Sequence, residues 1–238
     1  MMIAVTTSTM SFRFKQFFIE DSKCAMKVGT DGVLLGAWAP IVFSNQCSVF
    51  RILDVGTGSG LIARMLMQRC PEAEVEGIDI DEAAVDQAGE NGVKAYCSSL
   101  QKWQDSYDLI VSNPPYFQNS LKNPDEGRKA ARHTDTLSYA ELVHHSARLL
   151  TEHGLLALIL PAEAENEIRQ LAAVENLFLT HVTRVFSKEG KKPKRVLLAF
   201  SLNTGITGYR YTDDILVLED EKGGRSLPYQ ELCKEFYL

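Results

Sequence analysis

The sequence predicts an α/β fold built on a doubly wound, mostly parallel sheet of seven strands with helices on both faces. From about residue 50 onward, short apolar runs alternate with longer amphipathic stretches, which is typical of strands joined by helices. One of these runs, 155–160, is apolar throughout, as in a strand that is covered on both faces. The length of 238 residues fits one large domain, or one domain with a small appendage.

The periodicity of apolar residues predicts the strands and helices between residues 51 and 111. Leu61, Ile62, Met65 and Leu66 share one helical face, and the run RILDV before them suits a buried strand. In chain order we predict strand 51–55, helix 60–69, strand 75–80, helix 82–90, a third strand before residue 96 and a fourth strand at 107–111.

The second half begins with a clear helix start. Ser138 and Glu141 have the spacing of a capping box, and Gly154 is expected to stop the helix that they begin. Strand 155–160, helix 161–174 and strands 177–186 and 196–202 follow.

Three segments fall outside this rhythm, at 11–49, 117–137 and 203–238, and the last contains a strand-like run at 215–218. We therefore expect an N-terminal extension over residues 1–49 that covers the ligand site. Residues 50–202 form the core domain, and the extension over 203–238 packs on that core. Loops that decorate a core are where function concentrates.

Composition limits the kinds of partner. The net charge of -6 does not suit general binding to a polyanion, so any such contact needs a local basic patch. Five cysteines without a CxxC pair favour reduced thiols over disulfides or zinc, and the histidines do not suggest a metal site. No apolar run reaches the roughly 20 residues that span a bilayer. Residues 1–10 do not resemble a signal peptide, and Met10 is an alternative start. We expect a cytoplasmic monomer with no membrane contact.

A glycine-rich turn follows the first strand. Its candidate ligand-binding residues are Asp54, Gly56, Thr57, Gly58 and Gly60. Glycines let the backbone turn tightly and approach a ligand, and the N-terminus of the next helix favours an anionic group. In open α/β sheets, ligands bind beyond the carboxyl ends of the strands. Taken alone, the loop is equally consistent with a tight turn.

An acid ends the second strand about 20 residues later, a separation that suits a nucleotide ligand. There Asp79, followed by Ile80, is placed to accept hydrogen bonds from two ribose hydroxyls. Dinucleotide-binding folds share this acid, but their glycine spacing is G-x-G-x-x-G, whereas this loop reads G-x-G-x-G. The run DVGTGSG with its late acid resembles the cofactor motif of class I methyltransferases. That resemblance implies S-adenosylmethionine as cofactor, with Asp54 orienting the loop and the amino group of the methionine moiety.

The fourth strand ends in Asn113, Pro114, Pro115 and Tyr116, the most specific motif in the chain. An aryl amine is a poor nucleophile because its lone pair is delocalised. Two acceptors, the side-chain oxygen of Asn113 and the carbonyl of Pro114, can bind its two protons and draw the nitrogen toward tetrahedral geometry. Tyr116 offers a ring on which a base can stack, and proline fixes the local φ. The alternative is an Asn-Pro-Pro turn of purely structural use.

The NPPY motif is similar to that of amino-methyltransferases acting on adenine, guanine or protein glutamine. Further segments resemble the bacterial valine-tRNA adenine-N6 methyltransferase family, namely 12–19, 25–38, 131–137, 195–201, 229–232 and 236–238. This resemblance implies a Rossmann-like class I methyltransferase fold. It also implies methylation of adenine 37, next to the anticodon, with the tRNA anticodon stem-loop as partner.

The adenine end of the cofactor departs from such folds, which usually place an acid after the third strand. Residues 96–100 carry no acid, so we expect Ser99 or a backbone amide to serve. The resemblance also suggests that Lys27, Thr30 and Asp31 form a polar turn that closes over the cofactor. The alternative is that Thr30 or Asp31 caps a helix over 32–38.

Two groups of cations are candidates for RNA contacts. Lys188, Lys191, Lys192, Lys194 and Arg195 lie between the last two strands, and Arg128, Lys129, Arg132 and His133 follow the NPPY motif. Phosphate contacts through such groups predict salt-sensitive binding. The alternative is a solvated, charged turn.

Three other functions remain open. A protein glutamine methyltransferase would need a substrate domain, and only about 50 residues precede the first strand. A methyltransferase acting on guanine N2 of ribosomal RNA uses a similar motif. A non-catalytic RNA-binding module that retained the cofactor fold would not need an intact NPPY.

Overall fold

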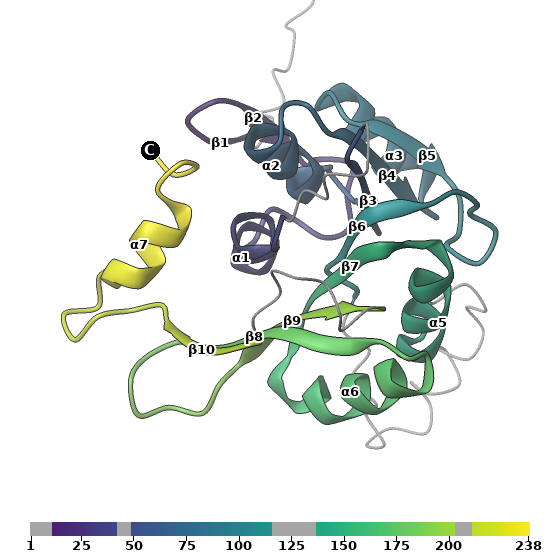
Figure 1. Cartoon of the computed structure of the whole chain (residues 1–238). Helices are drawn as coiled ribbons and strands as arrows, with labels where there is room; N and C mark the ends of the chain where they lie inside the picture. Colours follow the sequence, from purple (N-terminus) through teal and green to yellow (C-terminus); the bar gives the residue numbers. More distant parts are fainter. Residues whose placement is uncertain (1–10, 42–48, 116–136, 203–210) are drawn as a thin grey trace, which may run out of the picture.

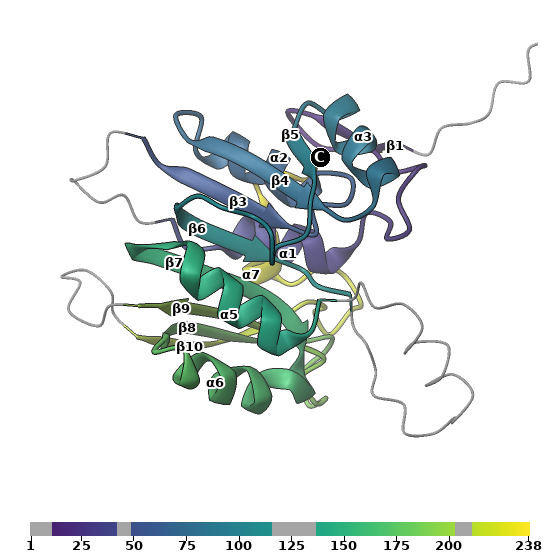
Figure 2. The same ribbon diagram turned by 90° about the vertical axis from the view of Figure 1, so that its right-hand side faces the viewer.

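The centre of the fold is a sheet with the strand order β10-β8-β9-β7-β6-β3-β4-β5, counted over the residues that the structure describes (Figures 1 and 2). The structure is a computed structural model that describes residues 11–41, 49–115, 137–202 and 211–238. The strands are β3 (Arg51–Val55), β4 (Glu74–Asp79), β5 (Lys94–Cys97), β6 (Tyr107–Ser112), β7 (Leu150–Pro161), β8 (Phe178–Phe186), β9 (Arg195–Ser201) and β10 (Thr212–Val217). Strand β9 runs antiparallel to β7 and β8, and the other neighbouring pairs are parallel.

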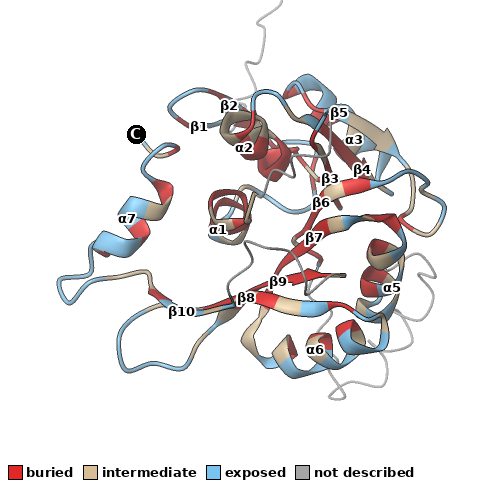
Figure 3. Ribbon diagram, in the orientation of Figure 1, coloured by how far each residue is buried: buried red, intermediate tan, exposed pale blue. Residues whose placement is uncertain are grey.

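Helices cover both faces of this sheet, which confirms the predicted fold class (Figure 3). They are α1 (Thr30–Trp38), α2 (Leu61–Arg69), α3 (Glu82–Glu90), α5 (Tyr139–Leu149), α6 (Glu165–Val174, preceded by the short helix η1, Ala162–Ala164) and α7 (Leu227–Cys233). Strand β7 shows why two layers are needed. Leu155, Ala157 and Ile159 join the core cluster of α1, α2 and α7, whereas Leu156 and Leu158 join that of α5 and α6. Successive residues of a strand point to opposite faces, so an all-apolar strand requires cover on both.

The sheet has eight strands among the described residues, not the seven predicted. The additional strand, β10, pairs in parallel with β8 and extends the sheet at that edge. Its sequence, TDDILV, carries two acids and exposes Ile215, because an edge strand is only partly covered. Such a mixed pattern is a weak strand signal, although the run at 215–218 gave part of it.

The predicted role of Gly154 as a helix stop is wrong. Helix α5 starts at the predicted capping box of Ser138 and Glu141 but ends at Leu149, and Gly154 lies within β7. A Cβ on Gly154 would lie 2.8 Å from the carbonyl oxygen of Tyr107. The glycine therefore permits the close approach of β7 to β6, where the strand register shifts between Tyr107 and Leu109.

A hairpin near the start of the described chain and a helix near the C-terminus were not predicted. Strands β1 (Ser11–Arg13) and β2 (Phe18–Glu20) form an antiparallel hairpin, and α7 lies near the C-terminus. Helix α7 packs against α1 and β10, and the backbone of Lys15 bonds that of Phe236. The β1–β2 hairpin and the C-terminal residues therefore meet on the face of the sheet that carries α1 (Figure 1).

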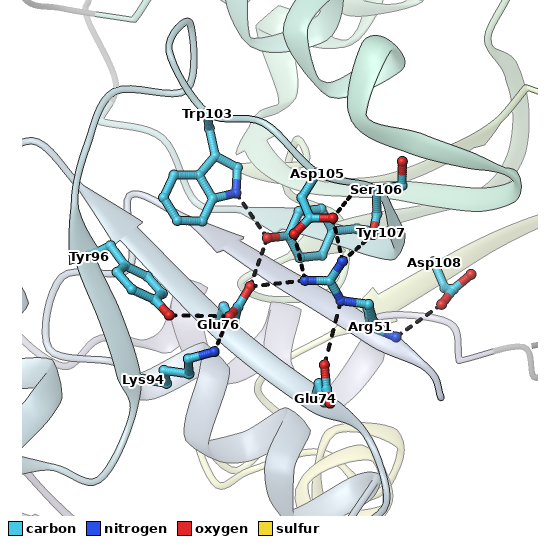
Figure 4. A network of polar contacts seen from close by, with 10 residues as sticks. All are labelled: Arg51, Glu74, Glu76, Lys94, Tyr96, Trp103, Asp105, Ser106, Tyr107 and Asp108. Atoms are coloured by element: carbon cyan, nitrogen blue, oxygen red, sulfur yellow. Dashed lines mark hydrogen bonds and ion pairs between the residues drawn. The ribbon is translucent and has the colours of Figure 1, made fainter. Parts of the chain in front are cut away.

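A polar network closes the amino-terminal edge of the sheet (Figure 4). The Glu76 carboxylate is 6% exposed and accepts from Tyr107 Oη at 2.8 Å and Lys94 Nζ at 2.6 Å. Arg51 lies 3.4 Å from Glu76 and forms two hydrogen bonds with Asp105. Burial alone would raise the pKa of Glu76, but the bonds from Lys94 and Tyr107 outweigh it and hold that pKa below its ordinary value.

Cysteine, metal and membrane features were searched over the described residues alone. The four cysteines found there, Cys24, Cys70, Cys97 and Cys233, are free, and Cys47 and Met10 lie outside these residues. No group of three or more potential metal ligands was found there. Over the same residues, none of the helices has the length and apolar character needed to cross a membrane.

Candidate active site

The glycine loop and the NPP turn leave the sheet side by side. Val55 and Ser112, the last residues of β3 and β6, are paired in parallel register. The Ser112 hydroxyl also donates to the carbonyl oxygen of Val55 at 2.8 Å. Gly56 and Asn113 follow these two residues, so both turns start at the same edge of the sheet. The chain passes from β3 to β4 on one side and returns to β6 on the other, so this is the topological switch point.

The glycine loop has a backbone that side-chain-bearing residues rarely adopt. Gly56, Gly58 and Gly60 have φ values of 71°, 54° and 78°. The amides of Gly56 and Thr57 donate to the carbonyl of Ile78, so the loop is fastened to the end of β4. These left-handed conformations explain why the sequence places glycine at alternate positions.

Two of these glycines face open space and the third does not. A Cβ built on Gly56 or Gly58 would have no atom of the described residues within 4 Å, whereas one on Gly60 would lie 2.7 Å from Val93. Gly60 therefore lets the loop pack on the core, while Gly56 and Gly58 leave room beside the switch point. That room is where a ligand of the loop would lie.

The lead acid of the loop is buried beneath it. Asp54 is 0% exposed, and its Oδ2 accepts from Thr57 Oγ1 at 2.8 Å and from the Ala63 amide at 3.2 Å. Among the described residues, its other oxygen, Oδ1, has no hydrogen-bond partner. Burial raises the pKa of Asp54 to about 7, although the bonds from Thr57 and Ala63 act in the opposite direction. A cationic group brought to Oδ1 would satisfy this carboxylate.

The second acid connects the loop to the next strand. Asp79 Oδ2 accepts from the Gly58 amide at 3.0 Å, and Oδ1 accepts from the Asp81 amide at 3.0 Å. Each carboxylate oxygen has a further lone pair, so two hydroxyl donors can still be accepted. Ile80 beside it is 55% exposed, an apolar surface suited to a flat ring. Ser99 is half-buried on the neighbouring turn, where the Ser98 amide bonds the carbonyl of Asp79.

The NPP turn meets the N-terminal segment. The Asn113 side chain is half-buried, and its Nδ2 lies 3.8 Å from the sulfur of Met26. Pro114 is buried and Pro115 is exposed. Tyr116, Phe117, Arg128, Lys129, Arg132 and His133 lie outside the described residues.

A turn over residues 21–29 carries Met26 to this position. Asp21 Oδ2 accepts from the Val28 amide at 2.7 Å, and Lys27 Nζ donates to the carbonyl of Asp21 at 2.6 Å. The preceding strand is held by Asn91, whose Nδ2 donates to the carbonyls of Glu20 and Ser59. The N-terminal extension is thus fastened to the glycine loop itself, and Lys27 bonds within its own turn.

Helix α1 begins at Thr30, before the residue 32 start that a Thr30 or Asp31 cap would predict. Its first residue is Thr30, and Gly29 stands at the N-cap without a side-chain hydrogen bond. The prediction that Thr30 or Asp31 caps this helix is therefore wrong, because both lie inside its first turn. Asp31 instead forms an ion pair of 2.7 Å with Arg195.

The basic loop between β8 and β9 lies at the same edge of the sheet. Pro161, at the carboxyl end of β7, pairs with Arg195, and the amide of Lys194 bonds the carbonyl of Val185. Lys188, Lys191, Lys192 and Lys194 are exposed. Lys188 pairs with Glu219 at 3.0 Å, which reduces the positive charge of the loop at that point.

These features fit S-adenosylmethionine. The open side of Gly56 and Gly58 leaves room for the methionine portion of the cofactor. Asp54 Oδ1, which has no hydrogen-bond partner among the described residues, suits the ammonium group. Asp79 has acceptor capacity for ribose hydroxyls, and Ile80 is exposed beside it. The site lacks an acid after β5, as the sequence indicated. Among the described residues, the exposed side chain of Ile80 offers an apolar surface there.

Comparison with known proteins gives a consistent family. The model of the methyltransferase small domain family matches residues 42–185. Relatives with the name tRNA1(Val) (adenine(37)-N6)-methyltransferase include one from Bacteroides fragilis, 40% identical over 95% of this chain and 97% of its own length. Another, from Parabacteroides distasonis, is 44% identical with the same coverage, and one from Yersinia pestis is 37% identical over 95% and 93%.

Solved structures support the fold alone. A predicted O-methyltransferase from Agrobacterium tumefaciens superimposes with a TM-score of 0.62 at 15% identity, over 86% of this chain and 96% of that one. A putative class I S-adenosylmethionine-dependent methyltransferase from Listeria monocytogenes gives 0.55 at 12% identity, over 83% and 70%.

Proposed function

Since the chain belongs to the methyltransferase small domain family, we propose that it transfers a methyl group from S-adenosylmethionine to N6 of an adenine in tRNA, at position 37 of valine tRNA. The observation that carries this proposal is the pairing of Val55 with Ser112, which sets the Gly56 turn and the Asn113 turn side by side. The name shared by relatives that match 95% of the chain supports the choice of substrate.

The cofactor is held by groups that are already arranged. The loop at Gly56 and Gly58 admits the methionine portion, Asp54 binds its ammonium group, and Asp79 accepts the ribose hydroxyls. Bound in this way, S-adenosylmethionine supplies an electrophilic methyl group on a sulfonium. Because the donor is strongly activated, the protein mainly has to position the amine.

The NPP turn prepares the amine. Asn113 Oδ1 and the carbonyl oxygen of Pro114 each accept a hydrogen bond from the N6 amino group. These two bonds direct the nitrogen lone pair toward the glycine loop. Pro114 is buried, so its carbonyl is set on a fixed backbone. Tyr116 is proposed, on the sequence motif alone, to stack on the adenine ring. An anticodon-loop adenine is unpaired, so placing it here costs less than flipping a duplex base.

The remaining assignments complete the proposal. The exposed lysines of the 188–194 loop contact RNA phosphates, and Arg128 and Arg132 are assigned the same role on the sequence alone. Residues 1–49 act as a cover, 50–202 as the catalytic domain and 203–238 as an extension packed on it. The protein acts as a cytoplasmic monomer without a metal, in keeping with a tRNA substrate and reduced cysteines.

A direct assay tests the reaction and separates it from the alternatives. Purified protein is incubated with methyl-labelled S-adenosylmethionine and an unmodified valine tRNA anticodon stem-loop, and the nucleosides are analysed by mass spectrometry. We expect N6-methyladenosine at position 37, lost in Asn113→Ala. Label in guanosine or in release-factor glutamine would favour the corresponding alternative. Unchanged turnover in Asn113→Ala would contradict the catalytic assignment. Cells that lack the gene should lack this modified nucleoside in valine tRNA.

A further inference from the structure

Arg195 differs from the lysines that precede it. Its Nε donates to Asp31 Oδ2 at 2.7 Å, and its Nη1 donates to the carbonyl of Lys194 at 3.0 Å. The Arg195 side chain is 31% exposed, and that of Asp31 is 24% exposed. The four lysines of this loop are exposed by comparison. These two bonds hold the guanidinium in one orientation against Asp31, whereas the lysine ammonium groups remain at the surface.

The ion pair joins two distant parts of the candidate site. Arg195 is the first residue of β9, at the carboxyl edge of the sheet, and it pairs across the sheet with Pro161. Asp31 is in the first turn of α1, directly after the turn over residues 21–29 that brings Met26 to Asn113. The pair therefore fixes the start of α1 at the edge from which the glycine loop and NPP turn also emerge.

Among the described residues, the first turn of α1 has no side-chain cap. Gly29 at the N-cap provides no side-chain hydrogen bond, and the Val33 amide bonds the Gly29 carbonyl at a long 3.3 Å. The first amides of a helix have no intrahelical partners, so contacts made by the residues of the first turn help to set its position. Asp31 is favourable in that turn because the N-terminus of a helix carries a partial positive charge. Its ion pair with Arg195 connects the turn to the start of β9.

We propose that Arg195 is a positioning residue for the cofactor site: through Asp31 it fixes the first turn of α1 and the cover over the glycine loop. It is not a ligand of RNA phosphate. The inference rests on the proposed function, and it assigns RNA contacts to the exposed lysines. Arg195 thus belongs to the machinery that closes on S-adenosylmethionine, although it follows the basic loop in the sequence.

The test compares Arg195→Gln, Asp31→Asn, the double variant and a control, Lys192→Gln, in the full chain. Three quantities are measured: amide exchange of residues 28–33 without ligand, the Kd of S-adenosylmethionine by calorimetry, and the salt dependence of binding to the anticodon stem-loop. In Arg195→Gln we expect faster exchange, a Kd raised about tenfold and an unchanged salt slope. Asp31→Asn should raise the Kd to a similar extent. The double variant should raise it little further, since both single changes break the same ion pair.

Lys192→Gln should give the opposite pattern, with the salt slope reduced by about 1 and unchanged exchange and cofactor Kd. If Arg195→Gln lowers the salt slope by about 1 while exchange and cofactor Kd stay unchanged, Arg195 is a phosphate ligand and the proposal is overturned. Wild-type protein that binds no S-adenosylmethionine would contradict the proposed function. Unchanged exchange in Arg195→Gln overturns the positioning role whatever the cofactor result, because that measurement needs no ligand.

Discussion

The hydroxyl of Ser112 donates a 2.8 Å hydrogen bond to the carbonyl oxygen of Val55, across the ends of two parallel strands. The parallel pairing of the strands already places the two turns side by side. The side-chain bond joins the two strands at the point where both turns begin. Ser112, which is 1% exposed, therefore adds a buried side-chain bond to the strand pairing that sets the glycine loop beside the NPP turn.

Replacing Ser112 should impair catalysis more than folding. Ser112→Ala removes one hydrogen bond and should lower the free energy of unfolding by about 1–2 kcal/mol. Because the Asn113 turn loses this anchor, we expect kcat to fall about tenfold or more, since small displacements of a positioned group are costly. Ser146→Ala is the matched control, because Ser146 is equally buried and its hydroxyl has no partner among the described residues. Equal losses of kcat in the two variants would contradict the anchoring role.

Two loop glycines should respond differently to alanine. Gly60→Ala places a Cβ 2.7 Å from Val93 at φ 78°, so we expect a loss of unfolding free energy of about 2–4 kcal/mol. Gly58→Ala, at φ 54° with open space around it, should cost only about 1–2 kcal/mol. That methyl group would enter the space assigned to the cofactor, so the Kd of S-adenosylmethionine should rise at least tenfold. Chemical denaturation and calorimetry measure the two effects, and an unchanged Kd in Gly58→Ala would place the cofactor elsewhere.

Much of the fold follows from local signals in the sequence. Strand β3 and helix α3 have the predicted bounds, because RILDV is a compact apolar run and Asp81 caps the helix that starts at Glu82. Helix α5 has the predicted capping box, since that motif depends only on residues three apart. Its end was wrong because Gly154 serves a contact with Tyr107, on another strand.

The candidate site was predictable where a motif is continuous in sequence. The loop from Asp54 to Gly60 and the turn at Asn113 are such motifs, and the order of the strands brings them together. The contact of Met26 with Asn113 and the pair of Asp31 with Arg195 join residues 87 and 164 positions apart. No local pattern encodes such partners, so the charge of Arg195 was assigned to the basic loop that precedes it.

Asp54 should make stability and cofactor binding depend on pH in opposite directions. Its pKa is raised from 3.8 to about 7, so between these values the folded protein holds a proton that the unfolded chain has released. The contribution of Asp54 to stability therefore falls as pH rises through this range. Without cofactor, the free energy of unfolding of Asp54→Asn relative to wild type should increase by about 1.4 kcal/mol per pH unit between about pH 5 and 7. Denaturation at several pH values measures this difference.

The cofactor should reverse the preference of Asp54. Because an ammonium group at Oδ1 stabilises the ionised carboxylate, the wild-type Kd of S-adenosylmethionine should increase as pH falls below about 7. Asp54→Asn should bind more weakly and with little dependence on pH in this range. A variant that binds as tightly as wild type at pH 8 would remove Asp54 from the cofactor site.

The network at the opposite edge should affect stability without affecting chemistry. Glu76→Gln removes the buried charge that faces Tyr107, Lys94 and Arg51, and should lower the free energy of unfolding at pH 7 by about 2–4 kcal/mol. The pKa of Glu76 lies below its ordinary value of 4.5, so this contribution is present above that pH and is lost as pH falls through the folded pKa. Wild type and variant should therefore converge in stability as the pH falls from 4.5 through the folded pKa.

Glu74→Gln is the control, because Glu74 is 64% exposed and 3.6 Å from Arg51, and it should change stability by less than about 0.5 kcal/mol. A constant difference between wild type and Glu76→Gln from pH 7 to pH 3 would mean that shape, rather than charge, is what Glu76 contributes.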